Sequence, residues 1–236
     1  MQKKLNHLGL FAKFWEPGKV KTRLANSVGN QNASSVYFAM VMNLLHKLDL
    51  CGDQRTIAFA PIEKENEFSS LVEQQGLNWN IEPQSAGGLG QRMTSFFKSK
   101  LDSTPTSVVL IGSDCLEIDA DTLDRAFAML NDSDVVLGPS FDGGYYLVGM
   151  STYRPEIFQD IEWSTESVFE QSIQRMKTHD ISYSILEQKH DIDHLEDLVR
   201  LKEQLVSGPG EDESNSVVKQ LNDKLREAIQ TALTDL

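Results

Sequence analysis

Four basic side chains gather in a short stretch after the first apolar segment, FAKFWEPGKVKTRL at 11–24. They are Lys13, Lys19, Lys21 and Arg23, and Glu16 is the only acid in that stretch. Because the whole chain carries a formal net charge of −13 at pH 7, this local excess of positive charge favours an anion-binding site over a solvated surface. Pro17 and Gly18 mark a turn, and an expected helix follows, so backbone N–H groups and basic side chains can converge on phosphate oxygens.

A carboxylate follows another apolar run, in VVLIGSDC at 108–115. The run stops at Gly112 and delivers Ser113 and Asp114 at the carboxyl end of an expected strand, where open α/β sheets bind ligands. Mg²⁺ prefers one or two protein carboxylates, with phosphate oxygens and waters completing its shell. Asp114 is therefore a candidate metal ligand, and capping of a following helix is the alternative that the sequence leaves open.

A second acidic cluster, QKHDIDHLEDL at 188–198, precedes an expected amphipathic helix. Asp191 and Asp193 could complete a metal site with Asp114. The alternative is that these acids favour the start of the helix through its dipole. His190 and His194 are more typical of surface or packing residues than of ligands.

Two glycine-rich segments could approach a ligand closely. In SFDGGYYLVGM at 140–150, Gly143 and Gly144 follow Asp142 and permit either a ligand-binding turn or a plain hairpin turn. In QSAGGLGQRM at 84–93, the glycines could wrap around a base or sugar, or mark only the passage from a loop into a helix.

Strands and helices alternate along the chain. Short apolar runs predict buried strands at 8–12, 55–60, 108–112, 135–138 and 145–150. Helical patterns lie between them, for example at 34–48 and 121–130. This alternation predicts an α/β sandwich with a mostly parallel central sheet, in a domain covering residues 1–206.

The C-terminal part has a different composition. SGPGEDESNS is polar and acidic, which predicts a flexible connector at 207–216. The final segment, 217–236, carries an apolar stripe and predicts an amphipathic helix. That helix needs an apolar partner, which could be its own domain or a second subunit in a homodimer.

The composition excludes several classes of protein. The strongly negative charge argues against a basic face for nucleic acid or an anionic membrane. Cys51 and Cys115 lie far apart and form neither a disulfide framework nor a zinc motif, which fits a reducing cytoplasm. No apolar run approaches the roughly 18 residues that span a bilayer. We therefore expect a cytoplasmic protein that binds neither nucleic acid nor membrane.

Six motifs together closely resemble a bacterial family in the nucleotide-diphospho-sugar transferase superfamily, which has the GT-A fold. The motifs are FAKFWEPGKVKTRL, GGLGQRM, IGSDC, LGPSFDGGYYLVG, EWSTESV and DIDHLEDL. The resemblance covers residues 5 to 205 and implies a three-layer α/β/α sandwich. Members are glycosyltransferase-like proteins, some linked to arsenosugar biosynthesis, and the family is similar to guanylyltransferases of the phospholactate and molybdenum-cofactor pathways. The chain departs from the family pattern at Trp15 and at His194-Leu195, neither of which is a proposed ligand.

The resemblance also implies a role for particular residues. It assigns the nucleotide to Lys13, Gly18, Lys21, Thr22, Arg23, Gly88, Gly90, Arg92 and Ser113. It assigns a divalent metal, Mg²⁺ or Mn²⁺, to Asp114 and Asp193. It assigns the border of a small-molecule acceptor to Asp142, Gly143, Gly144, Tyr145, Trp163, Ser164 and Thr165.

Three functions follow as hypotheses. The first is a metal-dependent nucleotidyltransferase, in which a phosphate or carboxylate acceptor attacks the α-phosphorus of a nucleoside triphosphate and expels pyrophosphate. Lys21, Arg23 and Asp114 would then be the catalytic residues. The second is a glycosyltransferase that uses a nucleotide-diphosphate sugar with the same metal. The third is a non-catalytic nucleotide sensor or assembly partner.

Overall fold

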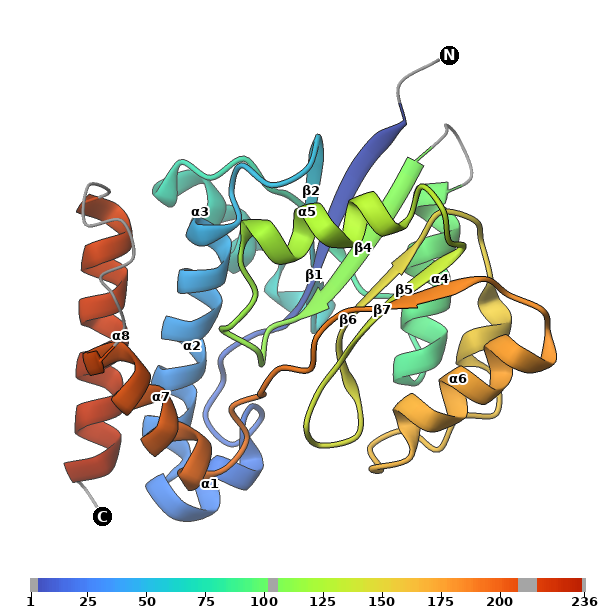
Figure 1. The fold of residues 1–236 in the computed structure, drawn as a ribbon. Helices are drawn as coiled ribbons and strands as arrows, with labels where there is room; N and C mark the ends of the chain where they lie inside the picture. The colour runs from blue at the N-terminus through green and yellow to red at the C-terminus, as the bar shows by residue number, and fades with distance from the viewer. Residues whose placement is uncertain (1–3, 102–105, 208–215, 235–236) are drawn as a thin grey trace.

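The computed structural model describes residues 4–101, 106–207 and 216–234, and in it seven strands form one sheet (Figure 1). The strands are β1 (Leu5–Lys13), β2 (Gln54–Ala60), β3 (Asn80–Pro83), β4 (Thr106–Gly112), β5 (Val135–Pro139), β6 (Tyr145–Met150) and β7 (Tyr183–Ile185). Their order is β3-β2-β1-β4-β6-β5-β7. In the described sheet only β6 runs antiparallel to its neighbours, so the predicted mostly parallel sheet is confirmed.

Helices cover both faces of this sheet. They are α1 (Thr22–Val28), α2 (Asn30–Lys47), α3 (Glu65–Gln75), α4 (Leu89–Leu101), α5 (Ala120–Met129), α6 (Val168–Thr178), α7 (Leu195–Ser207) and α8 (Ser216–Thr234), with short 3₁₀ turns η1 (Ile62–Lys64) and η2 (Pro155–Phe158). Within the described chain, no helix combines the length and apolar character needed to cross a membrane.

Alternation along the strands divides the core between two layers. In β4, Val109 and Ile111 belong to the cluster that includes α2 and α5, whereas Val108 and Leu110 belong to the cluster that includes α4 and α6. Successive side chains of a strand point to opposite faces, so a fully apolar strand feeds both layers. The result is the expected three-layer α/β/α sandwich (Figure 1).

Two short strands lack a sequence signal. The stretch Asn80–Pro83 contains Ile81 as its only strongly apolar residue, and Tyr183–Ile185 has three residues. Both lie at the edges of the sheet, where a strand has one neighbour and needs little apolar surface. All five strands that the sequence predicts are present.

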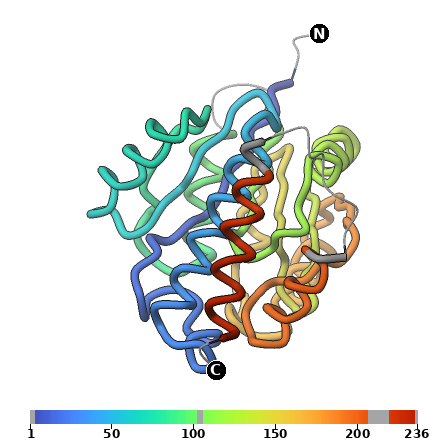
Figure 2. The backbone as a smooth tube through the Cα atoms, turned by 90° about the vertical axis from the view of Figure 1, so that its left-hand side faces the viewer, coloured from blue at the N-terminus to red at the C-terminus, as the bar shows by residue number. Residues whose placement is uncertain are grey.

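The final helix, α8, packs lengthwise along α2 of the same chain (Figure 2). Its side chains Leu225, Ile229 and Ala232 are buried in the cluster that contains the α2 core, and Asn43 donates a hydrogen bond of 2.7 Å to Asn222. The sequence left the partner of this helix open, and the structure supplies one within the chain. Most of the connector expected at 207–216 lies outside the described residues.

The direction in which successive strands are added to the sheet reverses at the pair β1 and β4, which are themselves parallel. From β1 the chain adds β2 and then β3 on one side, whereas β4 pairs with β1 on the other side. Such a switch point leaves a crevice at the carboxyl ends of the two central strands. Lys13 ends β1 and Gly112 ends β4, so both chemical motifs that follow these strands open onto this crevice.

Candidate functional site

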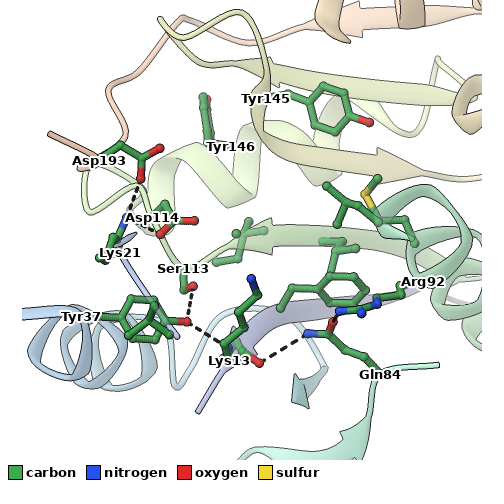
Figure 3. Close-up of a pocket in the computed structure, with 18 of the residues that line it drawn as sticks. Lys13, Lys21, Tyr37, Gln84, Arg92, Ser113, Asp114, Tyr145, Tyr146 and Asp193 are labelled. Atoms are coloured by element: carbon green, nitrogen blue, oxygen red, sulfur yellow. Dashed lines mark hydrogen bonds and ion pairs between the residues drawn. The ribbon is translucent and has the colours of Figure 1, made fainter. Parts of the chain in front are cut away.

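A cleft of about 570 Å³ lies at these strand ends (Figure 3). Five basic residues line it, namely Lys13, Lys19, Lys21, Arg23 and Arg92. Asp114 and Asp193 are the acids in its lining as far as the structure is described. Cations therefore outnumber carboxylates here, although acids outnumber bases in the chain as a whole. The cleft is suited to an anion that carries several negative charges.

The ammonium group of Lys21 lies between two carboxylates (Figure 3). It contacts Asp114 Oδ1 and lies 3.1 Å from Asp193 Oδ1, while its side chain is only 2% exposed. Burial opposes its charge, but the two carboxylates outweigh burial and raise the pKa of Lys21 above its ordinary value. Lys21 therefore stays charged inside the protein.

The turn after β1 fixes the position of Lys21. Gly18 has φ of +79°, which suits a glycine, and Lys21 itself has φ of +47° in the left-handed region just before α1. Val20 and Leu24 are buried on either side of it and anchor the loop in the core. Together these anchors direct the Lys21 side chain to the carboxylates. Gly18 serves the turn and does not line the cleft.

Asp114 is not a helix cap. The cap of α5 is Asp119, which accepts a hydrogen bond of 2.8 Å from the backbone N–H of Thr122. The carboxylate of Asp114 is half exposed and faces Lys21 in the cleft. The structure thus excludes Asp114 as the cap of α5, and metal binding by Asp114 stays a prediction.

The side chain of Asp193 likewise does not cap the helix that follows it, α7. The backbone N–H groups of Asp193 and His194 donate to Asp197 Oδ2, at 3.0 and 2.8 Å, so Asp197 satisfies the start of α7. The Asp193 carboxylate faces the cleft instead, with its Oδ1 near Lys21 and its Oδ2 3.2 Å from Arg23 Nη1. A backbone hydrogen bond of 2.9 Å from Ile192 to the carbonyl of Asp114 holds the two segments together.

Asp191 belongs to the same acidic neighbourhood but does not line the cleft. Burial, followed by the charges of Asp114 and Asp142, raises the pKa of Asp191 to about 7. Of the two carboxylates that the sequence offered for a metal site, the structure therefore brings Asp193 to the cleft.

Tyr37 is a site residue that sequence reasoning missed. Its hydroxyl accepts a hydrogen bond of 2.9 Å from the backbone N–H of Lys13 and lies 2.8 Å from Ser113 Oγ (Figure 3). This contact joins the ends of β1 and β4 to α2. Burial and the charge of Asp114 raise the pKa of Tyr37 to about 12, so the hydroxyl keeps its proton. In the sequence Tyr37 reads as one more apolar position of a helix, and no local signal distinguishes it.

Arg92 is held by the loop before α4. Its Nε donates to the carbonyl of Gly87 at 2.8 Å, and its Nη1 lies 3.2 Å from Gln84 Oε1. Gln84 is fixed in turn by the carbonyl of Ala58 at 2.8 Å. The guanidinium therefore has a defined direction in the cleft, and Gln84 is another lining residue that the sequence did not indicate.

Of the two glycines near α4 that were predicted to lie by the nucleotide, Gly90 has a packing role, whereas a side chain at Gly88 would meet open space. Neither Gly88 nor Gly90 lines the cleft, whereas Leu89 between them does. A Cβ atom at Gly90 would lie 2.8 Å from the indole nitrogen of Trp163. Gly90 is thus required for the close approach of the 161–167 segment to α4.

The residues predicted to border an acceptor separate into two groups. Tyr145 and Ser164 line the cleft, and so does Tyr146, the next residue of the same strand, which was not predicted. The others, Asp142, Gly143, Gly144, Trp163 and Thr165, do not.

Asp142 instead closes the β5–β6 hairpin turn. Its Oδ1 accepts hydrogen bonds from Ser140 Oγ and from the backbone N–H of Gly144, at 2.5 and 2.9 Å. At Gly143, where φ is +87°, an added Cβ would overlap the carbonyl oxygen of Glu166. These contacts hold the hairpin against the 161–167 segment, and an acceptor contact by Asp142 stays a prediction.

The carboxylates fit a divalent cation in part. Asp114 and Asp193 come from distant segments and converge on one cationic centre, which is at present the Lys21 ammonium. Among the described residues no group of three or more His, Cys, Asp or Glu side chains is arranged to hold a metal. A metal at this place would need phosphate and water oxygens for the rest of its shell, as Mg²⁺ prefers.

Comparison with protein families and curated proteins gives one match. A family model matches residues 45–165, about half of the chain, and is described as an uncharacterized protein conserved in bacteria (DUF2064). No curated protein matches the sequence.

Solved structures match over nearly the whole chain. A candidate nucleotide-diphospho-sugar transferase from Desulfovibrio desulfuricans G20 is 27% identical, with a TM-score of 0.80 over 96% of this chain and 99% of that one. A cytidylyltransferase from Leptospira borgpetersenii has 13% identity and a TM-score of 0.58, covering 97% and 98% of the two chains. A nucleotidyl transferase from Methanothermobacter has 11% identity and a TM-score of 0.59, covering 88% and 100%. The fold is that of nucleotide-diphospho-sugar transferases, and the comparisons support a transferase.

Proposed function

We propose that this chain, which belongs to the bacterial DUF2064 family, is a metal-dependent nucleotidyltransferase that acts on a nucleoside triphosphate. A small phosphate or carboxylate acceptor would attack the α-phosphorus with one oxygen. The bond from that phosphorus to the bridging oxygen would break, and pyrophosphate would leave with the electron pair. The observation that carries the proposal is the excess of cations in a cleft at the switch point of the sheet.

The chain's own residues would bind and stabilise charge. Lys13, Lys19 and Arg92 line the cleft and suit the β- and γ-phosphates, whose negative charge grows as pyrophosphate departs. Lys21 and Arg23 suit the transferring phosphoryl group, because they lie beside the two carboxylates. No protein nucleophile is needed. The thiol of Cys115 is buried, and burial raises its pKa to about 12, which argues against a thiolate attack.

Asp114 and Asp193 would hold a divalent cation, Mg²⁺ or Mn²⁺. When bound, such a cation supplies neutralisation of phosphate charge and orientation of the phosphate oxygens.

Glycosyl transfer is the second candidate. The candidate nucleotide-diphospho-sugar transferase from D. desulfuricans, similar over 96% of this chain, favours it. The sugar donor would place two phosphates against the same cations, and the leaving group would be a nucleoside diphosphate. The two reactions differ in the product released, which is pyrophosphate in one and a nucleoside diphosphate in the other.

A ligand screen followed by product detection tests the proposal. The unfolding temperature is measured with the four common nucleoside triphosphates and with nucleotide sugars, each with Mg²⁺ or Mn²⁺. A ligand at about a hundredfold its dissociation constant stabilises the protein by about 2.7 kcal/mol. Pyrophosphate release with phosphate- or carboxylate-bearing acceptors would support nucleotidyl transfer. Binding without turnover would indicate a nucleotide sensor, and no stabilisation by any nucleotide would refute the proposal.

A pair of matched variants locates the site. Arg23→Ala removes a cation of the cleft and should weaken triphosphate binding by roughly 1.5–3 kcal/mol, the range for a hydrogen bond to a charged group. Lys98→Ala removes an exposed cation on α4 that does not line the cleft, and should leave binding unchanged. Equal triphosphate affinities of the native protein and Arg23→Ala would show that Arg23 does not bind the phosphates.

A further inference from the structure

The Lys21 ammonium occupies the point at which the two candidate metal ligands converge. It engages Asp114 Oδ1 and Asp193 Oδ1, and Arg23 engages the other oxygen of Asp193, Oδ2. Both oxygens of Asp193 therefore already face a cation. A divalent cation bound by both carboxylates needs oxygens at about 2.0–2.1 Å. It must therefore take an Asp193 oxygen that Lys21 or Arg23 now uses, and it must lie close to the Lys21 ammonium.

Binding of a divalent cation to these carboxylates is unfavourable while the Lys21 ammonium lies beside them. Lys21 is almost fully buried, so water screens little of the repulsion between it and a second cation at the same point. Moving Lys21 away without a new partner would leave a buried charge unpaired, which is unfavourable. Free metal ions should therefore compete poorly with the resident lysine.

A phosphate group changes this balance. The cleft that holds Lys21 also presents Lys13, Lys19 and Arg92. Phosphate oxygens drawn in by these cations would offer the Lys21 ammonium a new anionic partner. Because Lys21 has a long, flexible side chain, it can turn to that partner without movement of the backbone. The carboxylates would then be free for a metal that arrives with the phosphates.

We propose that Lys21 is a resident cation that keeps free divalent ions out of the site, so that the site accepts a metal only as its complex with a phosphate-bearing nucleotide. This inference rests on the proposed function. It assigns Lys21 two successive partners, the carboxylates before the nucleotide binds and the phosphates afterwards.

Binding of Mn²⁺ alone, measured from the electron paramagnetic resonance signal of the free ion, tests the inference. Native protein should bind Mn²⁺ weakly in the absence of nucleotide. Lys21→Met removes the resident cation but keeps the length of the side chain, and should bind Mn²⁺ about tenfold more tightly, or more, because charge-assisted hydrogen bonds no longer have to be displaced. Lys21→Arg keeps a cation and should resemble the native protein. Asp114→Asn added to Lys21→Met should abolish the gain.

A matched control separates this effect from a general loss of positive charge. Lys100→Met removes a lysine that is ion-paired with Glu82 and does not line the cleft, and its affinity for Mn²⁺ should equal that of the native protein. Should Lys21→Met be marginally stable, its unfolding temperature still reports binding, because Mn²⁺ should raise it more than it raises that of the native protein.

The outcomes distinguish the inference from the function. If Lys21→Met binds Mn²⁺ no more tightly than native protein, or if Lys100→Met gains as much, the inference is overturned. In that case, stabilisation of native protein by a nucleoside triphosphate in the presence of Mn²⁺ would leave the proposed function standing. Failure of every triphosphate to bind, with or without Mn²⁺, would overturn the function as well.

Discussion

Removal of both counterions of Lys21 should destabilise the protein in a way that a third substitution reverses. In Asp114→Asn combined with Asp193→Asn, the buried ammonium loses both of the carboxylates that it contacts. An uncompensated buried charge costs about 3–5 kcal/mol. We expect about 3 kcal/mol, at the lower end of this range, because the side chains of Asp114 and Asp193 are 49% and 31% exposed and water screens part of the interaction.

The third substitution, Lys21→Met, removes the buried charge itself. The buried methionine needs no counterion, and the two asparagine amides lie at partly exposed positions where water can reach them. The triple variant should therefore be more stable than the double variant by most of the lost 3 kcal/mol or so. The assay is urea-induced unfolding, with the midpoint and the slope compared between variants so that a change in stability is separated from a change in compactness. A triple variant no more stable than the double variant would refute the reasoning, because Lys21 would then not be a buried charge held by these two carboxylates.

Three further results are expected. Tyr37→Phe and Ser113→Ala should each weaken nucleotide binding by about 0.5–1.5 kcal/mol or more, with the larger effect for Tyr37→Phe, which also leaves the Lys13 N–H without this acceptor. The double variant should be little weaker than Tyr37→Phe alone, because both substitutions remove the Tyr37–Ser113 hydrogen bond; additive effects in calorimetric titrations would contradict this. Burial lowers the pKa of His7 from 6.5 to about 4. As pH falls from 6.5 towards 4, the imidazole is protonated in the unfolded chain but not in the folded protein, so the free energy of unfolding decreases. His7→Gln should flatten this part of the pH profile of unfolding, and an unchanged profile would mean that other groups cause the loss of stability. Leu225→Ala should lower the free energy of unfolding, measured with urea, by about 2–5 kcal/mol, because the Leu225 side chain is only 1% exposed where α8 packs on α2. A decrease near zero would mean that α8 contributes little to the core.

Local patterns in the sequence determined most of the framework. Apolar runs such as 108–112 are buried on both faces, so their composition alone identifies a central strand. Because parallel central strands of such a sheet end at one edge, Lys13 and Asp114, which lie at or just after the ends of two of them, could be assigned to one site from the sequence alone. The basic loop at 11–24 was equally evident from charge against an acidic background.

Tertiary structure alone decided which polar groups meet in that site. Lys21 and Asp193 are separated by 172 positions in the chain, and their contact depends on the order of the strands and on the path of the segment before α7. The neighbouring carboxylates of Asp191 and Asp197 have the same chemistry, yet one lies outside the cleft lining and the other caps a helix. The partners of Tyr37 and of α8 were likewise set by the tertiary structure. An apolar helical face has the same sequence pattern whether it packs on a sheet, a second helix or another subunit. Periodicity reports that a face is buried, whereas its partner is set by contacts between segments far apart in the chain.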